Sequence, residues 1–145
     1  MIRILIVTLF TATALATCDS FSDGSVKNIK DLDENMIDLR MYHENLGDAI
    51  VKKDRDEALW LETGMDSVLR VVAGKFDEHR KLKKPFIESY EKDLHPFIGQ
   101  IHSSIEKGSW SEAGNAYTLL TKKCNGCHKD LDVDKEVQNW LLRPH

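Results

Sequence analysis

Several features are missing from this sequence of 145 residues. There is no excess of positive charge, since the formal net charge is −4, which argues against a nucleic-acid partner held by electrostatics. No stretch alternates apolar and polar residues between hairpin turns, so β-strands are not expected. No nucleophile–base pair and no phosphate-binding loop occurs, so we do not expect an enzyme. What remains is the composition of one soluble domain, 41% hydrophobic and 30% charged.

The apolar run at the N-terminus is too short to span a membrane comfortably. It extends from Ile4 to about Ala16 after one basic residue, Arg3, whereas a spanning helix needs roughly 20 apolar residues. A basic start and a small-residue end are typical of an export signal, which we assign to residues 1–17. The protein is therefore predicted to be periplasmic or otherwise extracytoplasmic.

Two cleavage routes fit the end of this signal. Residues 14–16, Ala-Leu-Ala, have the small-x-small pattern of ordinary signal peptidase, which would leave a protein with an unmodified thiol. Residues 15–18, Leu-Ala-Thr-Cys, resemble a bacterial lipobox, in which Cys18 would be lipidated and would anchor the protein to a membrane. The short signal and the polar stretch after it favour lipidation, and residues 18–30 are predicted to form a flexible tether.

Apolar residues recur at steps of three and four through four segments, which predicts four amphipathic helices. The segments begin, in order, at about Ile29, Asp54, Pro85 and Ser109. Asp54 is a candidate helix cap, and Ser109 with Glu112 is predicted to form a capping box. Short connections between such helices favour an all-α fold, an antiparallel up-down-up-down four-helix bundle formed by residues 31–132.

Two stretches depart from the helical pattern. Pro96 lies inside the third segment, so it should kink that helix or mark its true start just after Asp93. Residues 133–145 do not continue an apolar stripe, and we assign them to a C-terminal tail. The tail residues expected to cap one end of the bundle are Val137, Trp140 and Leu141.

The last helix carries the sequence Cys-Asn-Gly-Cys-His from Cys124 to His128. Cys124 and Cys127 continue the apolar stripe of that helix, so both thiols are expected to face inward. Zinc would need further thiols or histidines, a redox pair favours a strand-to-helix junction, and a disulfide at this helical spacing is strained. Covalent haem attachment remains, because C-x-x-C-H is its signature. We therefore predict one haem c, bonded to both thiols, with His128 on the iron.

At this motif the chain resembles known cytochromes. The stretch WSEAGNAYTLLTKKCNGCHKD, residues 110–130, looks like the last helix of cytochromes c′, and DLDENMIDLRMYHENL, residues 31–46, is similar to the first helix of soluble b-type four-helix-bundle cytochromes. The resemblance covers about residues 31–131. It implies a four-helix-bundle haem protein in which Met36 is the second axial ligand, opposite His128.

Met36 lies on the apolar stripe of the first predicted helix, near its start. In an antiparallel bundle this start faces the end of the last helix, so Met36 is expected at the level of His128. It is then either an iron ligand or, like most methionines on such a stripe, a filler of the core. His43 lies about 10 Å further along and is expected to be a hydrogen-bonded core or cavity residue. Surface positions are expected for the remaining histidines, His79, His95, His102 and His145.

The axial ligands decide which function is expected. With Met36 and His128 both on the iron, the haem is closed to small ligands and suits one-electron transfer with a redox partner protein. With His128 alone, as the cytochrome c′ resemblance implies, the iron would bind a gas such as nitric oxide. A third interpretation is a haem subunit of a larger redox complex. The resemblance also implies a homodimer, for which Met41 and Trp60 are candidate contacts.

Overall fold

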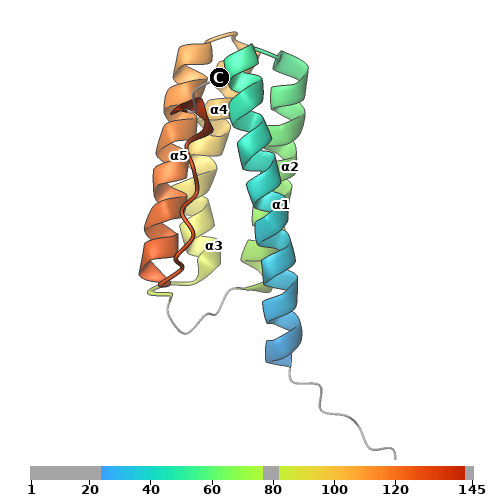
Figure 1. Cartoon of the computed structure of the whole chain (residues 1–145), viewed down its shortest axis with the longest axis vertical. Coiled ribbons are helices and arrows are strands. Elements are labelled where there is room, and N and C mark those ends of the chain that lie inside the picture. The colour runs from blue at the N-terminus through green and yellow to red at the C-terminus, as the bar shows by residue number, and fades with distance from the viewer. Residues whose placement is uncertain (1–23, 77–81, 143–145) are drawn as a thin grey trace, which may run out of the picture.

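The computed structural model describes residues 24–76 and 82–142, with side chains from residue 32 onward. The long helices in these ranges are α1 (Gly24–Lys52), α2 (Arg55–Lys75), α4 (His95–Glu106) and α5 (Trp110–Asp130). The shorter elements are α3 (Phe86–Ser89), the π-helical turn η1 (Tyr90–Leu94) and the 3-10 turn η2 (Trp140–Leu142). All regular structure in the described ranges is thus helical, with no strand, which confirms the predicted all-α class (Figure 1).

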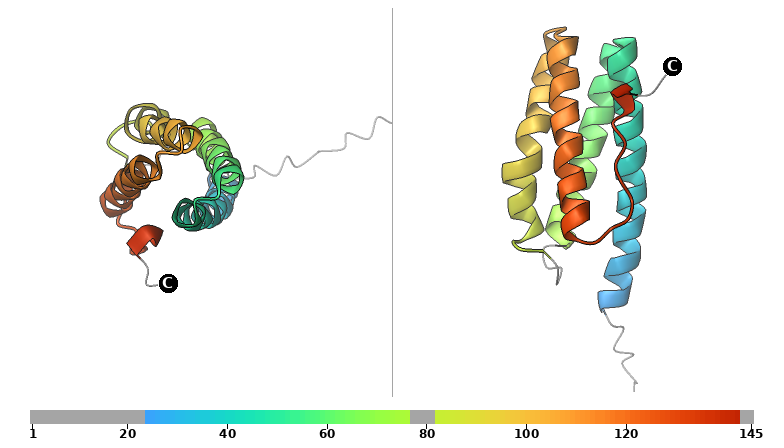
Figure 2. Two further views of the ribbon diagram at one scale, coloured as in Figure 1. Left: turned by 90° about the horizontal axis from the view of Figure 1, so that it is seen from above. Right: turned by 60° about the vertical axis from the view of Figure 1, so that its left-hand side comes forward.

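The helices pack closely side by side. α1 lies along α2, α4 lies along α5, and α2 also contacts α4. α1 and α5 run in opposite directions (Figure 1) and contact each other less than either contacts its neighbour. Seen end-on in Figure 2, the helices form an open arc, and η2 lies at the opening between α1 and α5. In the described parts of the chain, no helix is both long enough and apolar enough to cross a membrane.

The two predicted helix caps differ in outcome. The Asp54 side chain accepts a hydrogen bond from the backbone N–H of Glu57 at 3.1 Å, which confirms it as the cap of α2. Ser109 occupies the N-cap position of α5, but its side chain makes no capping hydrogen bond in the described structure, so the predicted capping box is wrong. Capping needs an extended backbone, which Asp54 has (ψ 101°) and Ser109 lacks (ψ 68°).

The first helix begins earlier than predicted. α1 starts ahead of Ile29, so residues 24–30, which were assigned to a flexible tether, form its first turns. A valine three residues before Ile29 extends the apolar spacing toward the N-terminus and explains the longer helix. The predicted export signal at residues 1–17 and the predicted lipidation residue Cys18 lie outside the described residues.

The interruption predicted near Pro96 is a π-helical turn. In η1 the backbone N–H of His95 donates to the carbonyl of Tyr90, five residues earlier. Pro96 has no N–H and its ring collides with the carbonyl four residues before it, so the chain widens by one residue there before α4 can begin. Asp93 within η1 accepts a hydrogen bond from Lys123 of α5 at 3.3 Å, which places this turn beside the last helix.

The C-terminal segment follows a course that was not predicted. Residues 133–142, named the strap below, run back along α5 in the opening between α1 and α5, instead of capping one end (Figure 1, Figure 2). Trp140 near the end of the strap is buried. The Asn139 side chain donates a hydrogen bond to the Thr118 hydroxyl at 3.0 Å. Polar contacts with α5 therefore direct the strap, which explains why an apolar pattern did not reveal its path.

Burial differs between the two ends of the helical assembly. At one end, near the α4–α5 connection, stripe residues are fully buried; this closed end contains Leu46, Ala49, Ile105, Ala113 and Tyr117. At the other end, where α1 begins and α5 finishes, stripe residues of these two helices are only partly buried although they contact the core. This motif end contains Leu32, Met36, Leu39 and Cys124.

Candidate functional site

Contacts around His43 define the register of α1 against α5. The His43 Nε2 atom lies 2.9 Å from the Thr121 hydroxyl oxygen, and the His43 and Tyr117 rings stack with centroids 4.4 Å apart. Met36 lies seven residues before His43, and His128 lies seven residues after Thr121. Seven residues span about 10 Å of an α-helix and end on nearly the same helix face. Because α1 and α5 are antiparallel, the step from His43 back to Met36 and the step from Thr121 on to His128 point in the same direction. Met36 and His128 therefore lie at about the same level.

Cys124 and Cys127 lie one turn apart on α5 and carry free, half-buried thiols. Residues three apart on a helix are neighbours on its surface, so the two sulfur atoms are presented together. Burial raises the pKa of Cys124 to about 12 although part of the residue remains exposed. Burial, together with the Asp130 carboxylate, also raises the pKa of Cys127. Both groups are therefore neutral thiols at neutral pH, and reactions that begin from a thiolate are suppressed in the folded chain.

His128 lies near the C-terminal end of α5 and is held by the strap. Its Nδ1 atom is 2.7 Å from the backbone carbonyl oxygen of Lys135. Because a carbonyl can only accept, Nδ1 must carry the hydrogen, and the lone pair of the neutral ring is then on Nε2. An open surface pocket of about 520 Å³ lies between the end of α5 and the strap and is lined in part by His128, Asn125 and Lys129.

Asn125 is a functional candidate that the sequence did not reveal. Its side-chain nitrogen donates to the backbone carbonyl of Val137 at 2.9 Å, and its side-chain oxygen accepts from the backbone N–H of the same residue at 2.6 Å. The amide thus pairs with both polar groups of one strap residue. Asn125 occupies a variable position of the C-x-x-C-H motif, and only the path of the strap gives it a partner.

His43 is buried and hydrogen-bonded, which confirms the prediction for this residue. It is 4% exposed, and its backbone carbonyl accepts a hydrogen bond from the Tyr117 hydroxyl at 3.0 Å. Burial lowers the pKa of His43 to about 4, so the ring is neutral at neutral pH. Burial also raises the pKa of the Tyr117 phenol. His43 therefore belongs to a structural polar cluster about 10 Å from the level of His128.

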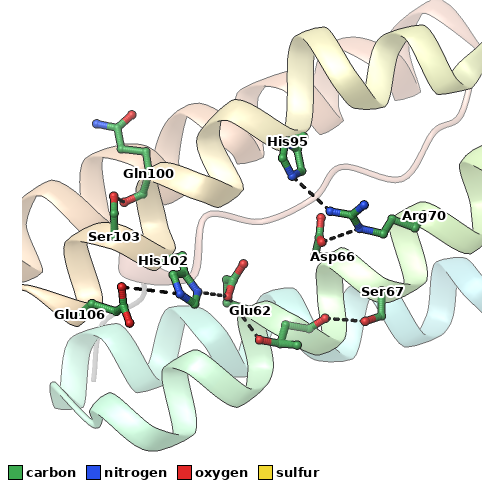
Figure 3. A network of polar contacts seen from close by, with 10 residues as sticks. Glu62, Asp66, Ser67, Arg70, His95, Gln100, His102, Ser103 and Glu106 are labelled. Atoms are coloured by element: carbon green, nitrogen blue, oxygen red, sulfur yellow. Dashed lines mark hydrogen bonds and ion pairs between the residues drawn. The ribbon is translucent and has the colours of Figure 1, made fainter.

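His95 is exposed, as predicted, and the His102 side chain is 44% exposed but also has a partner on another helix. The His102 Nδ1 atom lies 2.8 Å from a carboxylate oxygen of Glu62, whose side chain is only 7% exposed (Figure 3). Hydrogen bonding to Glu62 raises the pKa of His102, and burial raises the pKa of Glu62. This contact joins α2 to α4, and helical spacing alone does not identify a partner on another helix. His95 is exposed, whereas His79 and His145 lie outside the described residues.

Met41 and Trp60, the candidate contacts of a homodimer, are both exposed. Met41 on α1 is 44% exposed and Trp60 on α2 is 65% exposed. The Trp60 ring also meets the Tyr42 ring edge-on, with centroids 5.9 Å apart. This exposure leaves both side chains accessible, and the pairing of two copies stays a prediction.

The predicted haem-binding residues come from two helices. Cys124, Cys127 and His128 lie together at the end of α5, and Met36 comes from α1 at about the same level. In the residues that the structure describes, no cluster of three or more His, Cys, Asp or Glu side chains could hold a metal ion by itself. Binding an iron between one imidazole and one thioether does not require such a cluster. Comparisons with known proteins identify no matching family model, no matching curated protein and no matching solved structure.

Proposed function

We propose that the protein is an exported monohaem c-type cytochrome that transfers single electrons, built on an antiparallel up-down-up-down four-helix bundle. The observation that carries this proposal is the C-x-x-C-H motif at the end of α5, located where the stripes of α1 and α5 are only partly buried. A motif of this kind on an exposed helix face would have no apolar surface to receive a porphyrin. Here the sequence signature and uncovered apolar residues coincide.

The residues at the motif end fit haem c by their chemistry. Cys124 and Cys127 present two thiols one turn apart on α5, as attachment to two vinyl groups requires. The imidazole of His128 keeps its hydrogen on Nδ1, so Nε2 is the ring atom suited to iron. Leu32 and Leu39 on α1 are partly exposed apolar residues that a porphyrin would cover.

Met36 is the proposed second axial ligand. It is partly buried against the core and lies at about the level of His128. A thioether is a soft ligand that favours ferrous iron and so raises the reduction potential. The bound haem supplies the one-electron chemistry, while the chain holds it, covers it from water and provides the two ligands. His43 is already engaged by Thr121 and Tyr117 and is not proposed as a ligand.

Extraction of the purified protein with acid acetone tests the attachment. The full chain should be produced in a host that can mature c-type cytochromes. Haem should stay with the wild-type protein, whereas the double variant Cys124→Ala/Cys127→Ala should release all of it, because both thioether bonds are lost. Cys18→Ser is the matched control, since it removes the other cysteine and should retain the haem. Complete extraction from the wild-type protein would rule out the covalent site.

Membrane anchoring through Cys18 is the second part of the proposal. It is supported by the lipobox-like sequence at residues 15–18 and by the polar residues that follow. The mature protein should begin at Cys18, carry acyl chains and partition with membranes, and Cys18→Ser should release it into the soluble fraction. An intact mass that shows an unlipidated chain beginning at Thr17 would exclude lipidation.

A further inference from the structure

The strap is bound to the helix that carries the haem motif by hydrogen bonds along its length. Figure 2 shows the strap lying beside α5 in the reverse direction. Asn139 contacts Thr118, Val137 contacts Asn125 and the Lys135 carbonyl contacts His128. Strap positions at steps of two thus meet α5 at points that are two turns and then one turn apart. The last contact of this series is with the proposed iron ligand.

We propose that the strap positions the imidazole of His128, with the Lys135 carbonyl as the acceptor and Asn125 as the residue that holds this carbonyl in place. This inference rests on the proposed function, because it assigns His128 to iron. The Lys135 carbonyl selects the tautomer with hydrogen on Nδ1 and fixes the ring orientation. Such an acceptor behind a metal-bound histidine also increases the electron donation of the ring. The strap would thereby lower the reduction potential of the iron.

Asn125 is well suited to hold the strap in one register. It binds both the N–H and the carbonyl of Val137, at 2.6 Å and 2.9 Å. Val137 is two residues from Lys135, so a slip of the strap by one residue would move the acceptor about 3.3 Å from its place. The buried Trp140 ring anchors the far end of the strap. Asn125 is therefore a positioning residue that acts on His128 through the backbone of the strap.

The test uses the full-length haem protein and two substitutions to alanine, one at the clamp and one in the strap. Asn125→Ala removes the clamp without changing charge. Lys135→Ala removes an exposed side chain but leaves the backbone carbonyl in place. Two properties are measured in each protein, namely the reduction potential and, by NMR, the rate at which the Nδ1 hydrogen of His128 exchanges with deuterium. A third variant that ends after Asp132 removes the strap altogether and provides the same comparison if Asn125→Ala does not fold.

We expect Asn125→Ala to raise the reduction potential of the iron. The same substitution should accelerate exchange of the His128 Nδ1 hydrogen on the order of tenfold, which is the equivalent of one lost hydrogen bond. The variant that ends after Asp132 should show at least the same changes, and Lys135→Ala should match the wild-type protein. The proposal would be overturned if the reduction potential and the exchange rate of the Nδ1 hydrogen were unchanged both in Asn125→Ala and in the variant that ends after Asp132. Equal changes in Lys135→Ala and Asn125→Ala would also overturn it, since the effect would then come from the side chain.

The test distinguishes failure of the proposed role of the strap from failure of the proposed function. If the wild-type protein carries no haem, the proposed function fails, and the ¹⁵N shifts of the His128 ring in that same protein still report its tautomer. Hydrogen on Nδ1 in the wild-type protein, with a shift toward the other tautomer in Asn125→Ala, would support the positioning role of the strap. Hydrogen on Nε2 in the wild-type protein would contradict it.

Discussion

The closed end and the motif end continue the same two helix stripes but bury them differently. Leu46 on α1 and Tyr117 on α5 are 0% exposed. Seven residues along each stripe toward the motif end, Leu39 and Cys124 are only partly buried. The spacing of apolar residues is the same at both ends, so periodicity does not cause the difference. Trp140 of the strap fills the space between α1 and α5 at the closed end, whereas at the motif end the strap contributes backbone contacts. Apolar surface is thus left partly uncovered at the motif end, where the proposed haem would lie.

The largest difference is expected between Leu46→Ala and Leu39→Ala. After the haem has been extracted from the Cys124→Ala/Cys127→Ala background, Leu46→Ala should lower the free energy of unfolding by about 3–5 kcal/mol, because it leaves a cavity in a closed core. Leu39→Ala should cost roughly half as much, since part of its side chain is already in water. Denaturant titrations measure both. Equal costs would mean that the two ends are packed alike, and restoring the cysteines should increase the cost of Leu39→Ala alone.

Acid should weaken the closed end through His43. Its pKa is lowered by burial from 6.5 to about 4, so between these values the unfolded chain binds a proton that the folded chain does not. The stabilisation is complete above pH 6.5 and is lost progressively as the pH falls to about 4, in total about 3 kcal/mol. Unfolding free energies at pH 7 and pH 4 should therefore differ less in His43→Gln than in the wild-type protein. The exposed His95→Gln is the control, and identical pH dependence in all three proteins would exclude this role of His43.

A methyl group at Gly47 should disturb the contact between the strap and the closed end. A Cβ atom there would lie 2.6 Å from Trp140 Cβ and 2.8 Å from the Tyr117 hydroxyl, so Gly47→Ala should cost about 1–3 kcal/mol by overpacking. Gly99→Ala is the matched control on α4, where a Cβ would meet no described atom within 4 Å, and it should stabilise the protein by up to about 1 kcal/mol. A neutral Gly47→Ala would show that Trp140 can move aside freely.

The smallest effects are expected at the two helix caps of the closed end. Asp54→Ala removes the hydrogen bond to the Glu57 N–H and should cost about 1 kcal/mol. Ser109→Ala should cost less than half of this, because the Ser109 side chain forms no capping bond in the described structure. Thermal or denaturant unfolding compares them directly. A larger loss for Ser109→Ala would restore the capping box that the sequence suggests.

The helices, and the prediction that Met36 and His128 lie at one level, could be derived from the sequence because both depend on the spacing of residues along a helix. Steps of three and four identified the stripes of α1 and α5, and the same repeat relates Met36 to His43 and Thr121 to His128. Pro96 correctly indicated an interruption, but the choice of a π-helical turn over a simple kink depends on how η1 packs beside α5. Local chemistry therefore located the break and tertiary packing determined its form.

The strap was not accessible from the sequence, for a different physical reason. Its course depends on hydrogen bonds between its backbone and the side chains of Asn125 and His128, and any residue can supply such backbone groups. Apolar periodicity carries no information about them. The contact between His102 and the buried Glu62 was missed for a similar reason, because it joins two helices through polar atoms. Features held by polar pairing across the chain thus need the fold before they can be found.

The optical spectrum of the haem protein tests most directly whether Met36 and His128 bind one iron together. With both ligands bound, the oxidised protein should show a weak near-infrared band of sulfur-to-iron charge transfer, and the reduced protein should show sharp low-spin bands and bind carbon monoxide slowly or not at all. Met36→Ala should convert the iron to high spin and open it to carbon monoxide. A wild-type protein that is already high-spin and binds carbon monoxide quickly would contradict ligation by Met36, and gas binding would then replace electron transfer as the function.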